Sequence, residues 1–502
     1  MKPLKDLAGQ TLVYGLPSIV VRLLGYFLVP IYTHFFDPAE YGKITFIYSY
    51  ISFINIILTY GMETSLFNFS RLEENKKKVY STILISIICT SIIFIVLVNI
   101  FRQNFAELLN LPEHPEYIVW LGIILFLDTI SAIIFAKLRQ LNKARRFAII
   151  KASNILIYIF SNLFFIVLCS KIYKNPDSAF YPFIKSIYNP NIGIGYILIS
   201  NVLASGVTLL MLFPDMISAW VPLTKKTFDF DSALWKRMMP YAMPLVFAGL
   251  AGMVNETLDR LLIQYLIPDK TVSWQMGGIY SACYKLSIIV TMFVQAFKYA
   301  SEPYFFVNAK EKDFAKNFAD IVKYFIIGCL VVSLGTLLNL SWIKHLINER
   351  YWSGLKVVPI LLLANVCLGV FYTLSTWYKL ARKTMYGAYL TFIGAIITIA
   401  LNFYWIPRIG YMGSAWATLI CYATVMVISY FMSRKQLPVK YDFKRIAIYF
   451  GLSLILYFLS TQVTIDSKVL ALIANNGLIL VFLIVVYLME KPSFALLKNF
   501  KK

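Results

Sequence analysis

Long apolar stretches recur along the whole chain and are separated by short polar segments. Most are about 20 residues or longer, the length that an α-helix needs to cross the hydrocarbon core of a bilayer. The pattern therefore predicts fourteen membrane-spanning helices. Their predicted ranges are 7 to 36, 42 to 69, 79 to 101, 117 to 139, 147 to 169, 193 to 213, 237 to 266, 278 to 301, 319 to 341, 355 to 378, 384 to 406, 410 to 432, 446 to 464 and 469 to 489.

The seventh predicted span combines a bulky apolar face with a small and polar face. At 100° per residue, its small and polar residues fall within an arc of about 140° that contains Asn255, Glu256, Asp259 and Arg260. Charge inside a membrane is costly and usually functional, so this face predicts a hydrated cavity or a close helix contact. An intrahelical ion pair between Glu256 and Arg260 is the alternative, but it leaves Asp259 unexplained.

The first predicted span carries Arg22 near mid-membrane depth, within a stripe of small and polar residues. No acidic residue of the same helix lies near it. Two interpretations of Arg22 remain open. In the first, Arg22 forms an ion pair with an acid of another helix, for example Glu63 or Asp128. In the second, which we favour, Arg22 forms an anion-binding site in a cavity.

Other charged residues occupy the second, fourth, fifth and eighth predicted spans. Glu63 and Glu302 lie toward one membrane face, whereas Asp128 lies near the middle of its span, where it requires protonation, a partner or water. Lys285 is within reach of the acids of the seventh span. Lys151 lies close to an interface, so we interpret it as a simple anchor whose amine extends toward the headgroups.

The composition supports a membrane protein with many spans. Of 502 residues, 59% are hydrophobic, and the mean hydropathy is +0.69. Soluble domains rarely exceed about 50% apolar residues. The N-terminus has no small-residue cleavage site before a short apolar core, so we expect the first helix to be retained and not removed as a signal peptide.

The formal net charge of +22 is explained by topology and does not predict nucleic-acid binding. If both termini are cytoplasmic, most Lys and Arg residues outside the spans fall in cytoplasmic segments, such as Lys76 to Lys78 and Arg145-Arg146. This asymmetry follows the positive-inside rule, with attraction to anionic lipids as a second effect.

Motifs for catalysis are not found. The sequence has no phosphate-binding P-loop, zinc-protease or nucleophile-elbow motif, and it has three histidines. Six cysteines lie singly in apolar spans, so we expect no metal site or disulfide framework. Asp229 and Asp231 form a D-x-D, but the following residues indicate that Asp231 or Ser232 is the N-cap of the next helix. The chain is therefore not expected to be an enzyme or to hold a cofactor.

The first and second halves of the chain share a weak repeat. Tyr14-Gly-Leu-Pro17 opens one half and Tyr241-Ala-Met-Pro244 the other, and each opens a long span followed by a loop with Pro and Asp. An even number of spans per half gives both the same orientation and places binding between them. The predicted organisation is an N-lobe of six helices (1–213), a linker (214–236), a C-lobe of six helices (237–435) and two accessory helices with a basic tail (436–502).

Three segments carry a resemblance to a known family. The sequences LAGQTLVYGLPSIVVRLLGYFLVPIYTHFFDPAEYGKI, MMPYAMPLVFAGLAGMVNETLDRLLI and GGIYSACYKLSIIVTMFVQAFKYASEPYFF resemble polysaccharide exporters of the MOP superfamily, specifically Wzx-type flippases. The resemblance implies an all-α membrane protein with two six-helix lobes in a V that alternates between inward-open and outward-open states. It also implies cargo of undecaprenyl-diphosphate-linked oligosaccharide, moved to the periplasmic leaflet of a bacterial inner membrane for O-antigen, capsule or exopolysaccharide synthesis.

These two lines of inference assign expected roles to the charged residues. Cations suit a diphosphate cargo, and acids in the same cavity can carry a coupling proton or sodium ion. The substrate-binding residues are predicted to be Arg22, Arg260 and Lys285. The ion-coupling or gating residues are predicted to be Glu63, Asp128, Asn255, Glu256, Asp259 and Glu302.

The expected partners are the lipid-linked oligosaccharide, membrane lipids, a polysaccharide polymerase and glycosyltransferases. Two sister branches of the superfamily supply the alternatives. One is a flippase of lipid II, the peptidoglycan precursor, and the other is a drug or cation antiporter of the MATE type.

Overall fold

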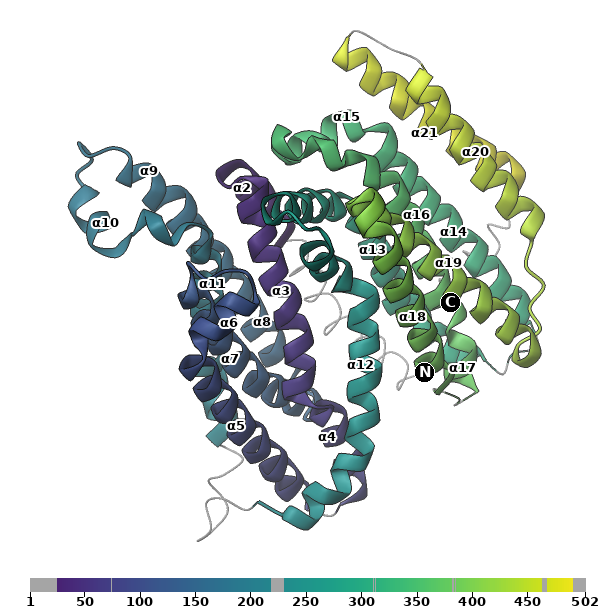
Figure 1. Ribbon diagram of the computed structural model, residues 1–502. Helices are drawn as coiled ribbons and strands as arrows, with labels where there is room; N and C mark the ends of the chain where they lie inside the picture. Colours follow the sequence, from purple (N-terminus) through teal and green to yellow (C-terminus); the bar gives the residue numbers. More distant parts are fainter. Residues whose placement is uncertain are drawn as a thin grey trace. The chain divides into compact units, whose positions relative to one another are not determined.

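A computed structural model describes residues 25–73, 75–217, 230–309, 311, 313–381, 383, 385–462 and 467–490. Within these ranges every regular element is a helix (Figure 1). Thirteen helices or helix runs of the described residues are long and apolar enough to cross a membrane. The predicted fold class, an all-α membrane protein, is confirmed.

The thirteen helical runs match the second to the fourteenth predicted spans one by one. Several extend beyond the predicted bounds; for example, the span predicted at 278–301 is part of a helix from Lys270 to Asn308. The first predicted span lies mostly outside the described residues, and its described end contains α2 (Leu28–Phe35). Hydropathy therefore located the spans correctly, whereas the polar ends of the helices were missed.

The chain divides by its own contacts into two compact units. The N-terminal unit ends at Gly278 and the C-terminal unit starts at Ile279, inside the long helix α13 (Lys270–Asn308). The two lobes predicted at 1–213 and 237–435 were defined by the sequence repeat and not by contacts. The division into these lobes therefore remains a prediction. The remaining helices of the N-terminal unit are α3 (Pro38–Thr59), α4 (Met62–Leu72), α5 (Lys76–Ile100), α6 (Arg102–Leu108), α7 (Pro115–Gln140), α8 (Ala144–Asn162), η1 (Leu163–Cys169), α9 (Ser170–Tyr173), α10 (Tyr181–Ile187), η2 (Pro190–Gly195), α11 (Tyr196–Ile217) and α12 (Ser232–Leu266).

The helices of the N-terminal unit pack around one apolar core. Its buried members come from α4, α5, α7, α8, α11 and α12, and include Leu66, Tyr80 and Ile134. Helix α7 lies against α3, α5 and α11, and α11 in turn packs on α8. Helix α7 therefore has other helices on several sides, and its Thr129 and Ser131 are buried.

A sharp break divides the second predicted span into α3 and α4. Tyr60 and Gly61 have positive φ values, 29° and 70°. This conformation is costly for residues with a side chain and is easily adopted by glycine. In addition, a Cβ at Gly61 would press against the carbonyl oxygen of Ala242. The break redirects the chain, so that Glu63 at the start of α4 points into the bundle.

Two glycines allow α3 and the start of α13 to touch through their backbones. A Cβ at Gly42 would overlap the carbonyl oxygen of Trp274, and a Cβ at Gly278 would overlap that of Pro38. Larger residues at either position would push the helices apart. This contact ties the first turns of α13 to the N-terminal unit.

The C-terminal unit contains the rest of α13 and eight further α-helices. Helices α16, α18 and α19 share one core, and α20 and α21 pack on α14 around Leu334, Leu456 and Phe482. The helices are α14 (Phe314–Leu338), α15 (Leu340–Ile343), η3 (Lys344–Leu346), η4 (Glu349–Lys356), α16 (Val357–Leu374), α17 (Thr376–Leu380), α18 (Met385–Ile409), α19 (Tyr411–Gln436), α20 (Phe443–Gln462) and α21 (Lys468–Glu490).

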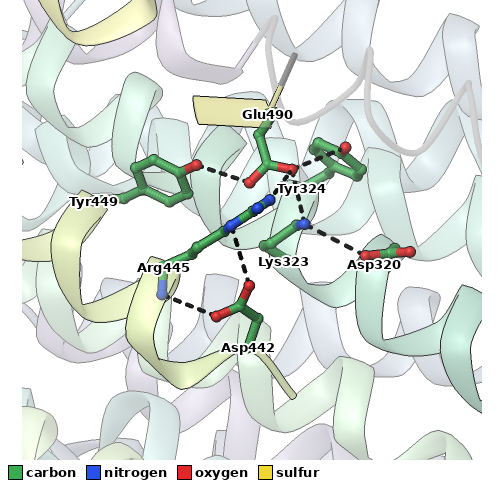
Figure 2. A network of polar contacts seen from close by, with 7 residues as sticks. All are labelled: Asp320, Lys323, Tyr324, Asp442, Arg445, Tyr449 and Glu490. Carbon is green, nitrogen blue, oxygen red and sulfur yellow. Dashed lines mark hydrogen bonds and ion pairs between the residues drawn. The ribbon is translucent and has the colours of Figure 1, made fainter. Parts of the chain in front are cut away.

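A network of charged and hydroxyl groups joins α14, α20 and α21 (Figure 2). We call it the Glu490 network. The Glu490 carboxylate accepts hydrogen bonds from Lys323 at 2.8 Å, Tyr449 at 2.7 Å and Tyr324 at 3.2 Å. The Arg445 guanidinium lies 3.2 Å from the same carboxylate. The network therefore fastens the last two helices to α14.

The expected N-cap of α12 is confirmed. The Asp231 carboxylate accepts a hydrogen bond from the backbone N–H of Leu234 at 2.9 Å and pairs with Lys78 at 2.8 Å. Lys78, and then the Leu234 N–H, lower the pKa of Asp231 from its usual value. The D-x-D position of Asp231 thus has a structural role at the start of a helix; Asp229 lies outside the described residues.

Candidate functional site

A polar cavity of about 380 Å³ lies inside the N-terminal unit. It is formed by α3, α4, α7, α8 and α11, and we call it the N-unit cavity. Two acidic and two basic side chains face it, so its formal charge is balanced. Its lining residues are Asn55, Glu63, Asp128, Ser131, Ala132, Phe135, Arg139, Phe147, Lys151, Asn154, Asn201, Ser205 and Thr208.

Glu63 and Arg139 form an ion pair in the wall of the cavity. The Arg139 Nη2 donates to Glu63 Oε2 at 2.8 Å, and each side chain keeps between a third and two fifths of its surface exposed. The break at Gly61 brings Glu63 to this position, and Arg139 comes from the last turn of α7. Because water reaches both groups, the pair contributes modestly to stability.

Asp128 lies in the middle of α7 and accepts a hydrogen bond from Ser205 of α11 at 2.6 Å. Its second carboxylate oxygen has no protein partner within the described residues. Lys151 of α8 lines the same cavity, and its Nζ lies 4.3 Å from the centre of the Phe135 ring. This placement corrects the interpretation of Lys151 as a simple interfacial anchor.

Three polar atoms of the lining residues are buried and have no hydrogen-bond partner among the described residues. They are Asn55 Oδ1, Ser131 Oγ and Arg139 Nε. Buried polar groups are costly unless they are paired, and a polar cavity of this size has room for water molecules that can satisfy them. The N-unit cavity is therefore built to hold water or a small polar ligand.

The predicted residues of α12 have different environments. Asp259 is buried, whereas Asn255 and Arg260 are half-buried and Glu256 is exposed. Arg260 Nη1 donates to the backbone carbonyl of Glu256 at 3.3 Å. Across the described ranges, no ion pair joins the Glu256 carboxylate to Arg260, so that alternative is not supported. None of these residues lines the N-unit cavity.

The other predicted residues fall elsewhere. Glu302 of α13 pairs with Lys379 of α17 at 2.5 Å within the C-terminal unit. Lys285 of α13 is half-buried in the same unit. Arg22 lies outside the described residues. The structure thus brings Glu63 and Asp128 together, and the joint cationic site of Arg22, Arg260 and Lys285 remains a prediction.

Sequence reasoning missed most residues of the cavity, although a signal for them exists. On α7, Asp128, Ser131 and Arg139 follow the three-to-four-residue spacing of one helix face. On α11, Asn201, Ser205 and Thr208 repeat it. Polar residues at helical spacing within an apolar span predict that this face of the helix packs against another polar face. They do not predict which helix supplies that second face.

Comparison with known families gives one match. The model of the family described as "Polysaccharide biosynthesis protein" matches residues 7–309, more than half of the chain. No curated protein matches the sequence.

Solved structures share the fold across nearly the whole chain. One is the lipid II flippase MurJ in an inward closed conformation, with a TM-score of 0.66 and 15% identity over 95% of this chain and 99% of that one. A multidrug resistance transporter of the MATE family in inward-facing form has a TM-score of 0.62 and 12% identity over 86% and 98%. The Vibrio cholerae MATE transporter VcmN has a TM-score of 0.58 and 13% identity over 87% and 98%.

At these identities the likeness to the solved structures shows the fold alone. That fold is the one of membrane transporters and flippases, and it agrees with the thirteen candidate spans. Together with the family match, it establishes that this chain belongs to the polysaccharide biosynthesis protein family and has the fold of the MOP superfamily.

Proposed function

We propose that this protein is a flippase that moves an undecaprenyl-diphosphate-linked oligosaccharide across a bacterial inner membrane by alternating access. The single observation that carries the proposal is the match to the polysaccharide biosynthesis family over 7–309 in a chain with a transporter fold. A family that serves polysaccharide synthesis handles glycans, and a fold shared with a lipid II flippase suits a glycan carried on a lipid. The glycan then feeds O-antigen, capsule or exopolysaccharide synthesis.

The cationic residues supply the affinity for the diphosphate in this proposal. Moving a phosphate out of water requires charged partners, and guanidinium and ammonium groups are suited to it. Arg22, Arg260 and Lys285 are the proposed partners of the headgroup, while the polyprenyl tail stays in the lipid. A polymerase and glycosyltransferases would act on the product and supply the substrate.

In this proposal the acidic residues couple transport of the cargo to the binding of an ion. A bound proton or sodium ion changes the balance between the two states of a transporter if it binds one state more tightly. Glu63 and Asp128 are supported by their shared cavity. Glu302 is held by Lys379, which favours a gating role. Asn255, Glu256 and Asp259 complete the proposed set on α12.

Depletion of the protein in its host tests the identity of the transported cargo. We expect the complete repeat unit to accumulate on its lipid carrier at the cytoplasmic face, with normal peptidoglycan synthesis. Lipid-linked glycans are extracted, separated and quantified by mass spectrometry. Accumulation of lipid II with cell lysis would assign the protein to peptidoglycan synthesis instead, and accumulation of neither would contradict a flippase function.

Replacement of Arg22 tests the headgroup site. Arg22→Ala should abolish surface polysaccharide while the protein still inserts at a normal level, because the proposed cationic partner of the diphosphate is lost. Arg102→Ala is the matched control, since Arg102 is exposed at the start of α6. Normal polysaccharide in the Arg22→Ala strain would contradict the assignment of Arg22.

A further inference from the structure

The hairpin of α9 and α10 carries an exposed apolar surface outside the helical bundle. Figure 1 shows this hairpin projecting from the N-terminal unit beyond the ends of α8 and α11. Phe180, the N-cap of α10, is 66% exposed, and Phe183 and Ile187 of α10 are 60% and 42% exposed. Such an exposed apolar cluster marks a contact with lipid or with a partner.

The three exposed side chains share one side of α10. At 100° per residue, Phe180, Phe183 and Ile187 fall within an arc of about 60°, and we call them the apolar face of α10. Ile184, at the edge of this arc, is buried. Lys185 is exposed and lies on the opposite side of the helix. Helix α10 is therefore amphipathic, and nothing in the N-terminal unit covers its apolar face.

Stacked aromatic rings hold the hairpin in place. The ring of Tyr188 stacks on that of Tyr196, with 5.0 Å between their centroids. Tyr173 contacts Tyr188 at 5.6 Å and Tyr181 at 5.9 Å. The backbone N–H of Asn189 donates to the Tyr196 hydroxyl at 2.7 Å. Because Tyr196 is the first residue of α11, these contacts fix α10 to the ends of two candidate spans.

The length of the preceding span places the hairpin at the level of the lipid headgroups. This candidate span runs from Ala144 to Tyr173 and has Arg145 and Arg146 at its start, where basic residues mark a membrane interface. At about 1.5 Å per residue, Tyr173 lies about 40 Å from Arg146. A bilayer with its headgroup regions is about that thick. Helix α10 follows Tyr173 closely and therefore begins at the opposite interface.

The apolar face of α10 continues a surface that already faces lipid. Phe160 and Leu168, on the span that leads to the hairpin, are exposed apolar side chains of a membrane-spanning helix. Aromatic residues are also enriched where a membrane meets water, since their rings suit the headgroup level. The position and composition of α10 thus match those of a helix that lies in the interface.

The charge of the hairpin favours the same contact. Residues 170–189 contain three lysines and one acid, Asp177. The lysines are Lys171, Lys174 and Lys185, all exposed, and we call them the lysine cluster. Anionic headgroups attract basic residues held close to a membrane surface. An apolar face beside a cationic cluster is therefore complementary to an anionic lipid surface.

We propose that α10 is an interfacial anchor, which inserts its apolar face into the leaflet opposite the Arg145–Arg146 end of α8 while the lysine cluster contacts anionic headgroups. The partner is the membrane surface itself. The inference is independent of the transported cargo. The anchor holds the ends of α8 and α11 at one depth, and both helices line the N-unit cavity.

Spin labels on single cysteines test the depth of α10 in the full-length protein, reconstituted into vesicles of phosphatidylcholine and phosphatidylglycerol. The exposed native cysteine, Cys89, is first replaced by Ser. Phe183→Cys and Lys185→Cys form a matched pair on opposite sides of the helix. We expect the label at 183 to be relaxed by oxygen and protected from a water-soluble nickel chelate, and the label at 185 to show the reverse.

Two outcomes of the labelling would overturn the proposal. Equal access of the chelate to both labels would show that the apolar face lies in water, where it is free for a partner protein. Shielding of the label at 183 from both reagents, with dipolar broadening between labels, would assign the face to a second copy of this chain.

Amide hydrogen exchange of the wild-type protein keeps the test valid if the labelled variants do not fold. A helix of seven residues is unstable in water by itself, so its protection depends on what it contacts. We expect the amides of α10 to exchange at least about fivefold more slowly in nanodiscs of phosphatidylglycerol than of phosphatidylcholine, because an anionic surface supplies roughly that factor per lysine.

Replacement of the whole lysine cluster by Gln should remove this difference between the two lipids. The matched control replaces Lys76, Lys77 and Lys236 by Gln, since these lysines are exposed at the starts of α5 and α12 in the same unit. The control should keep the difference. Equal exchange of wild-type α10 in both lipids, or a difference that survives loss of the lysine cluster, would contradict the anchor.

Discussion

The N-unit cavity and the Glu490 network are two clusters of charge within helical bundles, and they differ in how completely their groups are paired. Glu490 accepts from Lys323, Tyr324 and Tyr449 and contacts Arg445. None of the seven residues in Figure 2 has a buried atom without a partner. The cavity, in contrast, leaves Asn55 Oδ1, Ser131 Oγ and Arg139 Nε unsatisfied.

This difference distinguishes a structural cluster from one that can bind a ligand. A fully paired network gains nothing from an additional ion or water, and it holds its helices in one arrangement. An incompletely paired cavity gains stability when water or a ligand satisfies its free polar atoms, so binding there can be linked to movement. We therefore expect mutations in the Glu490 network to affect stability first and mutations in the cavity to affect coupling first.

The largest effect on stability is expected from Glu490→Ala. The side chain of Lys323 is 6% exposed, and breaking a buried pair by removal of one partner costs about 3 kcal/mol or more. The free energy of unfolding should fall by about that amount, and amide hydrogens of α20 and α21 should exchange faster. Chemical unfolding in mixed micelles and hydrogen-exchange mass spectrometry measure the two effects.

The network itself offers a matched control for this change. Asp442 pairs with Arg445 at 3.3 Å, but its side chain is 44% exposed, so Asp442→Ala should cost less than about 0.5 kcal/mol. Replacement of both Lys323 and Glu490 by Met should recover most of the lost stability, because no buried charge remains unpaired. If Glu490→Ala were as stable as the wild type, the Glu490 network would not be a structural cluster, and its contrast with the N-unit cavity would be contradicted.

A smaller effect is expected from Arg139→Leu in the cavity. Arg139 and Glu63 are both partly exposed, so loss of their ion pair should lower the free energy of unfolding by about 1 kcal/mol or less. Chemical unfolding in mixed micelles measures this change as well. A loss of stability as large as that of Glu490→Ala would show that the cavity is a structural cluster too.

The smallest effect concerns the ion pair of Lys78 and Asp231 at the surface of the N-terminal unit. Lys78 lowers the pKa of Asp231 in the folded protein. Its contribution to stability is therefore complete above the ordinary Asp pKa of about 4 and is lost as pH falls through the lower folded value. Lys78→Ala should lower the melting temperature slightly at neutral pH and not at about pH 2. An equal difference at both pH values would contradict this assignment.

The spans could be predicted because hydropathy is a local property of the chain. Thirteen of the fourteen predicted spans have a described helical counterpart, and the cap at Asp231 followed from its position before an apolar stretch. The break at Tyr60 and Gly61 was not predicted. A positive φ at a tyrosine depends on the contacts around it, here the approach of α12 at Ala242.

The cavity could be predicted only in part. Asp128 and Glu63 were identified because acids are rare within apolar spans. Arg139 and Lys151 lie near helix ends, where long basic side chains ordinarily extend to the interface, so their inward direction is a result of tertiary packing. The meeting of α3, α7, α8 and α11 at one cavity depends on contacts between distant parts of the chain, which one sequence does not contain.

Reconstitution of the purified protein into liposomes with a lipid-linked oligosaccharide tests the central claim most directly. Accessibility of the glycan to a lectin or glycosidase added outside reports flipping. The account predicts flipping that an imposed proton or sodium gradient accelerates, that loses this response in Asp128→Asn and that keeps it in Asp442→Ala. An absence of flipping, or a rate that responds to the gradient equally in wild type and Asp128→Asn, would contradict an ion-coupled flippase.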